Sequence, residues 1–91
     1  MIKTEKIDGL EVFSCLPARK TSRPPLLFVH GAFAGGWMWT DTFMPALADA
    51  GYPCYALSLR GHGDSYGREH IDWHSVNDYV DDVAAVVNWL G

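Results

Sequence analysis

The feature that most constrains the fold is a short apolar run that ends in a glycine-rich turn, within residues 25–39. Leu26–Val29 is wholly apolar and partly β-branched, with prolines before it and His30-Gly31 directly after it. A run of this kind predicts a parallel strand that is buried on both faces of a sheet. The small residues that follow allow backbone N–H groups to point into open space. The stretch therefore predicts a strand that leads into a functional turn.

Size and charge exclude several classes of protein. The chain has 91 residues, a net charge of −4 and 48% hydrophobic residues, so residues 1–91 are expected to form a single folded domain. Because Lys and Arg form no cluster, we expect no nucleic-acid partner. Residues 1–9 lack the apolar core of a signal peptide and no run is long enough to cross a bilayer, so we expect a cytoplasmic protein with no membrane partner. Cys15 and Cys54 lack a CxxC spacing and are interpreted as buried core thiols.

Local patterns before and after the central run predict further strands. Asp8-Gly9 separates Ile2–Ile7 from Leu10–Leu16, which predicts an antiparallel hairpin with a type I′ turn. Asp41–Ala50 has helical spacing, and Tyr52–Leu59 is an apolar run bounded by glycines. A strand, a helix and a strand of these lengths predict a right-handed βαβ unit with parallel strands.

A long loop and a second helix complete the expected elements. Residues 60–74 have neither helical nor strand period and hold three glycines, which is typical of a functional loop. Ser75 with Asp78 resembles a capping box, and the apolar positions after it predict an amphipathic helix that ends at Gly91.

Two motifs in this element order resemble the α/β-hydrolase superfamily. They are His30-Gly31 after one strand and Arg60-Gly61-His62-Gly63-Asp64-Ser65 after the next, and they are similar to those of esterase-like and lysophospholipase-like members. The segment Gly35-Gly36-Trp37-Met38-Trp39 also resembles the plant methylesterase and hydroxynitrile lyase branch.

The resemblance implies a truncated α/β-hydrolase fold. It implies a hairpin followed by βαβα and a mostly parallel sheet of about four strands, the amino-terminal part of a domain that commonly needs about 200–250 residues. In the family, the nucleophile elbow, the catalytic acid and the catalytic histidine come later, on segments that these residues do not match.

The resemblance also implies candidate catalytic groups. The backbone N–H of Ala32 or Phe33 would stabilise the negative charge that develops on a carbonyl or phosphoryl oxygen. Gly63–Gly67 matches the GxSxG pattern and makes Ser65 a candidate nucleophile. That motif has meaning on a turn from strand directly into helix, and here a loop separates it from the next helix, so we favour a structural glycine-rich turn. A local triad of Ser65 with His70 or His74 is the alternative.

Histidines and carboxylates gather near the same predicted edge of the sheet. His62, Asp64, His70 and His74 lie in or next to the long loop, and His30 ends the neighbouring strand. Imidazole and carboxylate form a ligand set suited to a divalent metal, with Zn²⁺ the first choice, and a bound water would then act as nucleophile. The spacing matches no established zinc pattern, and in the resembled family the histidines of the HG and GHG motifs normally stabilise loops.

A partner and two functions follow from this interpretation. In the resembled family, Leu26–Val29 is paired on both sides, so an unpaired edge here predicts a homodimer through that strand. The first function is a small hydrolase of carboxylic or phosphoric esters that uses metal-activated water on a small-molecule ester substrate. The alternative is an inert amino-terminal fragment of a serine hydrolase, or a structural module that needs complementation.

Overall fold

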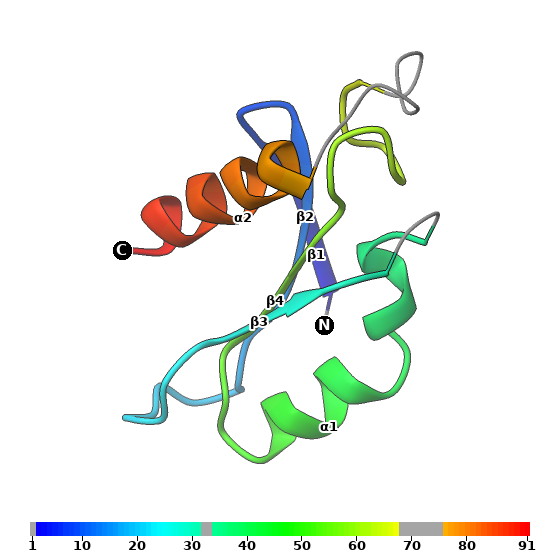
Figure 1. Ribbon diagram of the computed structural model, residues 1–91. Helices are drawn as coiled ribbons and strands as arrows, with labels where there is room; N and C mark the ends of the chain where they lie inside the picture. The colour runs from blue at the N-terminus through cyan, green and yellow to red at the C-terminus, as the bar shows by residue number, and fades with distance from the viewer. Residues whose placement is uncertain (1, 32–33, 68–75) are drawn as a thin grey trace.

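The computed structural model describes residues 2–31, 34–67 and 76–91 of the chain. Their elements are β1 (Ile2–Ile7), β2 (Leu10–Cys15), β3 (Leu26–Val29), the 3-10 helix η1 (Gly36–Trp39), α1 (Phe43–Asp49), β4 (Cys54–Leu57) and α2 (Val76–Leu90). The strands form one sheet in the order β1-β2-β4-β3, with α1 on one face and α2 on the other (Figure 1). The α/β fold is therefore as expected from the sequence.

The sheet is mixed, with one parallel and two antiparallel ladders. The hairpin β1-β2 turns at Asp8 and Gly9, whose φ angles of 52° and 82° are those of the predicted type I′ turn. β2 pairs antiparallel with β4, and β4 pairs parallel with β3, from Leu26 opposite Cys54 to Val29 opposite Leu57. The predicted parallel pairing across the βαβ unit is confirmed.

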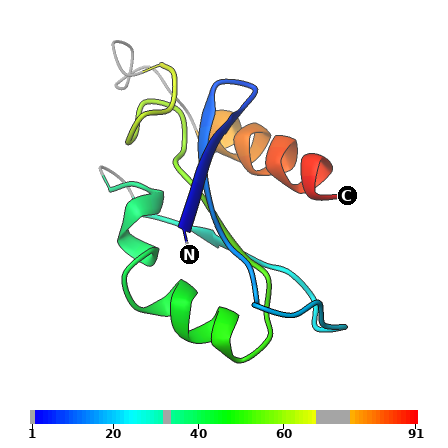
Figure 2. The same cartoon turned by 180° about the vertical axis from the view of Figure 1, so that it is seen from behind.

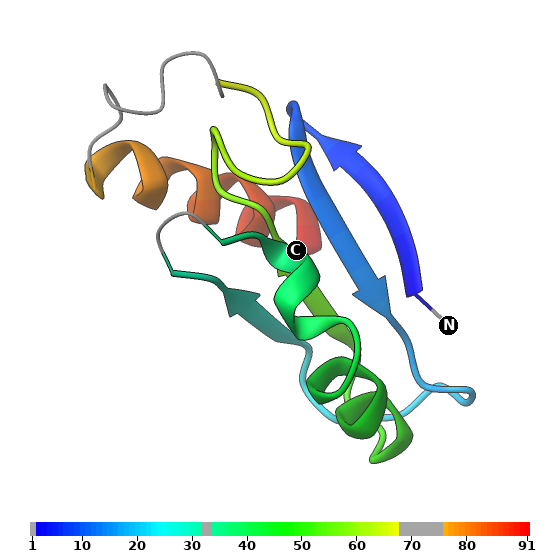
Figure 3. The ribbon, with the colours of Figure 1, turned by 90° about the vertical axis from the view of Figure 1, so that its right-hand side faces the viewer.

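β3 lies at an edge of the sheet, and β1 lies at the other (Figure 3). The expectation that Leu26–Val29 is buried on both faces is wrong, because the first three residues of β3 are half-buried and Val29 is 43% exposed. The physical reason is that, within the described residues, only β4 pairs with this strand. The expected open edge is present.

The helices α1 and α2 lie on opposite faces of the sheet (Figure 2), and an apolar cluster lies between the sheet and each helix. Successive strand residues point to opposite faces, so Leu57 packs toward α2 while Ala56 packs toward α1. The α2 cluster contains Leu10, Val12, Leu57, Leu59 and Val86, and the α1 cluster contains Cys15, Met44, Ala48, Cys54 and Ala56. Both cysteines are free and buried, as expected.

Several element ends differ from the sequence prediction. The 3-10 helix η1 was not predicted, α1 begins at Phe43 and not at Asp41, and β4 spans only Cys54–Leu57. The predicted capping residue Ser75 lies outside the described residues, whereas Asp78 does lie in the first turn of α2. Within the described part of the chain, no helix is long and apolar enough to cross a membrane.

Candidate functional site

The candidate site lies where β3 and β4 end. Both strands run in the same direction, so the loops that follow them leave the same end of the sheet (Figure 3). Ligand sites in α/β sheets form at this end. The imidazole rings of His30, after β3, and His62, after β4, lie 4.8 Å apart between centroids. The structure thus brings together the two motifs that the sequence analysis identified.

His30 clamps the ends of the two parallel strands together. Its Nδ1–H donates to the carbonyl oxygen of Gly31 at 2.6 Å, and its Nε2 accepts the backbone N–H of Leu59 at 2.9 Å. The side chain is buried, and burial together with the nearby charge of His62 lowers the pKa of His30 below its ordinary value. His30 is therefore a neutral structural imidazole whose two nitrogens both have backbone partners.

His62 is also buried and bonded to the backbone. Its Nδ1 lies 3.0 Å from the carbonyl oxygen of Arg60, and the centroids of its ring and the Tyr79 ring lie 5.9 Å apart in an edge-to-face arrangement. Asp64 is exposed, and its backbone carbonyl accepts a hydrogen bond from the Lys6 ammonium. These contacts stabilise the loop after β4.

The predicted metal ligands do not come together within the described residues. Among residues 2–31, 34–67 and 76–91, no group of three or more His, Cys, Asp or Glu side chains is placed to hold a metal ion. The candidate ligands His70 and His74 lie outside these ranges. Zinc binding by this loop stays a prediction.

Ser65 is a buried loop anchor in this arrangement. Its Oγ accepts the backbone N–H of Glu11 at 2.7 Å and donates to the backbone carbonyl of Ser58. A serine nucleophile needs a base to take its proton, but here the proton points at a carbonyl oxygen. Only 5% of the residue is exposed, so the Ser65 hydroxyl holds the loop against β2 and β4.

Two hydrogen bonds to one carbonyl oxygen fix the start of the turn after β3. The carbonyl oxygen of Gly31 accepts the N–H of Ala34 at 3.3 Å as well as the His30 imidazole. The predicted oxyanion donors Ala32 and Phe33 lie outside the described residues, so their role stays a prediction.

The sequence analysis missed a buried carboxylate in β2. Glu11 is 6% exposed, and its Oε1 accepts Ser58 Oγ at 2.7 Å and the N–H of Asp64 at 3.3 Å. Ser58 Oγ in turn accepts the N–H of Gly36 at 2.9 Å. The sequence did offer a signal, because Glu11 stands among the apolar residues of a predicted strand. A charged side chain at such a position is rarely buried unless it has partners.

A second missed pair anchors α2 to the loop after β4. Asp82 is 2% exposed and accepts the backbone N–H of Arg60 at 2.7 Å and its Nε at 3.1 Å. The hydrogen bond to Asp82 raises the pKa of the Arg60 guanidinium. Because Asp82 lies among the apolar positions of the predicted helix, its position in the sequence could have indicated a buried partner.

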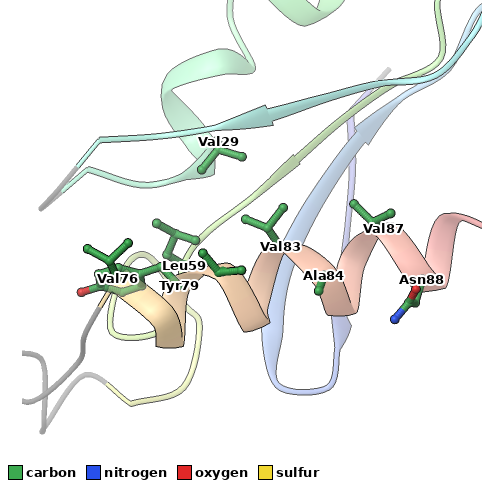
Figure 4. Close-up of a pocket in the computed structure, with 9 residues that line it drawn as sticks. Val29, Leu59, Val76, Tyr79, Val83, Ala84, Val87 and Asn88 are labelled. Atoms are coloured by element: carbon green, nitrogen blue, oxygen red, sulfur yellow. The ribbon is translucent and has the colours of Figure 1, made fainter.

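An apolar groove lies between the open edge of β3 and α2. It has a volume of about 470 Å³, and Val29 faces α2 across it (Figure 4). Val76, Val80, Val83 and Val87 line its other side. Val76 is 76% exposed and Val80 is 57% exposed, so this groove presents unburied apolar side chains.

Comparison with known proteins agrees with this architecture. A family model described as the alpha/beta hydrolase fold matches residues 24–91. Bifunctional epoxide hydrolase 2 of Rattus norvegicus is 30% identical over 70 residues, which are 77% of this chain and 12% of that protein. The chain thus spans about an eighth of the length of this curated relative.

Solved structures match nearly the whole chain. An epoxide hydrolase from an endophytic Streptomyces superimposes with a TM-score of 0.73 and 29% identity, over 100% of this chain and 26% of that one. The thioesterase domain from the curacin biosynthetic pathway gives a TM-score of 0.73 and 26% identity, over 97% of this chain and 30% of that one. With the family model matching more than half of its residues, this chain belongs to the α/β-hydrolase family.

Proposed function

We propose that the chain contributes the oxyanion side of a hydrolase site for a small ester or epoxide, and that a strand pairing with the open edge of β3 supplies the nucleophile. The observation that carries the proposal is the juxtaposition at the end of β3. There, among the described residues, the strand has a neighbour on one side only, and the neutral imidazole of His30 fixes its end to Leu59, just after β4. Nucleophile and oxyanion donors must lie within a few ångströms of each other, which adjacent parallel strands allow.

The substrate class is inferred from the family and from the names of similar proteins. Relatives described as epoxide hydrolases and a thioesterase share this part of the fold. A nucleophile attacks the carbonyl carbon of a thioester or an ester and a ring carbon of an epoxide. Negative charge develops on oxygen in each case. The backbone N–H groups of Ala32 and Phe33 are the donors we propose for that oxygen.

The candidate site residues Ser65 and His30 are already hydrogen-bonded to the backbone, which supports a nucleophile from another segment. The Ser65 hydroxyl donates to a backbone carbonyl, and both nitrogens of His30 have backbone partners. Water activated by zinc at His62, Asp64, His70 and His74 is the competing mechanism.

For the isolated 91-residue chain, we propose a homodimer through Leu26–Val29. The open edge of β3 and the apolar groove beside it would otherwise face water. The same edge would receive the complementing strand, so dimerisation and complementation compete for one surface.

Turnover of an aryl ester and a styrene-type epoxide tests the proposal. We expect the purified 91-residue chain to give no hydrolysis above a Ser65→Ala control, with or without added zinc. Hydrolysis that is lost on chelation would instead support metal-bound water. Hydrolysis that survives chelation but is lost in Ser65→Ala would support the local serine and would contradict an external nucleophile.

A further inference from the structure

Glu11 stands where three segments of the chain meet. It directly precedes Val12, the first residue of β2 that pairs with β4, and its backbone carbonyl accepts the N–H of Ser58 at 2.8 Å. Its side chain reaches the loop after β4, where Oε1 accepts the N–H of Asp64 at 3.3 Å. The first hairpin of the chain thereby contacts the candidate site through one buried carboxylate.

The carboxylate also acts through the Ser58 hydroxyl. A hydroxyl has one proton, and Ser58 Oγ gives it to Glu11 Oε1 at 2.7 Å. Its lone pairs are then free to accept, and they receive the N–H of Gly36 at 2.9 Å. The order of donation therefore runs from Gly36 to Ser58 to Glu11, with the carboxylate as final acceptor.

Close approach of the loop backbones confirms how tightly this cluster is packed. A Cβ added at Gly63, whose φ is +52°, would lie 2.5 Å from Glu11 Oε1 and 2.7 Å from Ser58 Oγ. A Cβ at Gly36 would lie 3.0 Å from the carbonyl oxygen of Leu57. Both loops come as near to β2 and β4 as backbone without side chains allows.

The two bonds at Gly36 and His30 hold both ends of the segment that follows β3. His30 fixes its start to Leu59, and Ser58 fixes its end through the Gly36 N–H. Donors on this segment can stabilise a developing charge only if they are held in place before the reaction.

We propose that Glu11 is a positioning residue of the candidate site, which fixes the turn after β3 through Ser58 and the loop after β4 through the Asp64 N–H. The inference rests on the proposed function for its catalytic meaning. Its structural content stands separately, because the two hydrogen bonds can be measured in the chain without any turnover.

Amide hydrogen exchange followed by NMR tests the structural content. In Glu11→Ala, the Gly36 and Asp64 amides should exchange at least tenfold faster, while amides of the β2-β4 ladder such as Phe13 keep their rates. Glu11→Gln retains an acceptor oxygen and should restore protection at both amides. Glu5→Ala, which removes a carboxylate from the neighbouring strand β1, is the matched control and should change neither amide.

A second variant separates the two connections and covers a failure of Glu11→Ala to fold. Ser58→Ala removes the acceptor of the Gly36 N–H but leaves the acceptor of the Asp64 N–H. We expect faster exchange at Gly36 alone. Unchanged exchange at Gly36 in Ser58→Ala, or an equal rise at every amide in Glu11→Ala, would overturn the proposal.

The catalytic meaning is tested in an assembly that hydrolyses substrate. There Glu11→Ala should lower kcat at least tenfold with KM changed less than twofold, and Glu11→Gln should recover most of kcat. An unchanged kcat alongside altered exchange would overturn the positioning role in catalysis. Absence of any hydrolysing assembly would count against the proposed function and leave the exchange result as it stands.

Discussion

Two regions of the molecule differ in how their side chains are satisfied. One is the end of the sheet where β3 and β4 finish, and the other is the apolar groove between the open edge of β3 and α2. At the first, buried polar groups have partners: the Glu11 carboxylate, the Ser58 and Ser65 hydroxyls and the His30 imidazole are all hydrogen-bonded. Among residues 2–31, 34–67 and 76–91, the Trp39 indole N–H is the one buried side-chain polar atom without a partner. At the groove, Val29, Val76 and Val80 remain exposed.

The difference indicates which region is complete within these residues. Buried polar networks are stable only when their members are satisfied, and the loop network meets this condition from its own residues. The groove leaves apolar side chains in water and an unpaired strand edge, which favours association with another strand. The chain therefore has a hydrogen-bonded loop network next to a surface whose apolar side chains are not covered.

The largest effect is expected where the loop network meets α2. Asp82→Ala leaves the mostly buried Arg60 guanidinium without its main partner and should lower the free energy of unfolding by about 3 kcal/mol. Asp78→Ala is the matched control, because Asp78 is partly exposed and lies 3.6 Å from Arg60. We expect a loss below about 1 kcal/mol there. Urea unfolding followed by circular dichroism gives both values, and equal losses would contradict a buried anchor.

The next effect tests the close approach of the turn after β3 to the sheet. An alanine Cβ at Gly36 would lie 2.9 Å from Phe13 Cδ2 as well as against the Leu57 carbonyl. Gly36→Ala should therefore cost about 1–3 kcal/mol. Gly31→Ala meets nothing within 4 Å and should be nearly neutral. A tolerated Gly36→Ala, measured by the same unfolding assay, would show that the turn is not fixed against β4.

A smaller effect concerns the proton affinity of His30. Its pKa in the folded chain is lowered from the ordinary 6.5, so the unfolded chain binds a proton at higher pH than the folded chain does. The contribution of His30 to stability is present above pH 6.5 and decreases as the pH is lowered below that value.

Urea unfolding at a series of pH values between 7.5 and 5.5 measures this dependence. His30→Gln removes the titrating group and should flatten the curve, although it lowers stability at every pH. A slope in His30→Gln as steep as in the wild type would contradict the assignment of the pH dependence to His30.

The smallest effect on stability is expected in the groove. Val80→Lys replaces an exposed residue and should change the free energy of unfolding by no more than about 0.5 kcal/mol. It should nevertheless weaken self-association at least tenfold, because it introduces a charge into the apolar groove. Asn77→Lys, on an exposed part of the same helix and outside the groove, should leave association unchanged. Light scattering across micromolar concentrations measures both, and a wild type that is monomeric throughout would refute the homodimer.

Much of the fold could be predicted because its signals are local. The Asp8-Gly9 turn requires two positive φ angles, and the apolar run Leu26–Val29 between prolines and His30-Gly31 specifies a strand and its end. The amphipathic period of α2 predicted a helix whose described part is Val76–Leu90. Each of these depends on residues that are neighbours in the sequence.

The connections in the candidate site could not be predicted, because they join residues distant in sequence. Glu11 meets Ser58 and Ser65 only after β2 pairs with β4 in one register, and Asp82 meets Arg60 only after α2 packs on the sheet. Exposure of Val29 likewise depends on which strands are present beside β3. The histidines and carboxylates around one loop predicted that His62 binds a metal ion. A sequence pattern cannot show that His62 is buried or that its ring bonds the Arg60 carbonyl.

We propose that residues 24–91 supply the oxyanion turn of a hydrolase site, which a strand beside β3 and the family's remaining catalytic groups complete. A chimera tests it most directly, with this segment replacing the matched segment of the Streptomyces epoxide hydrolase. We predict a folded chimera that opens an epoxide, and a matched Gly36→Ala chimera with lower kcat. A chimera that unfolds cooperatively, keeps the nucleophile accessible to a covalent inhibitor and still gives no turnover would contradict the claim.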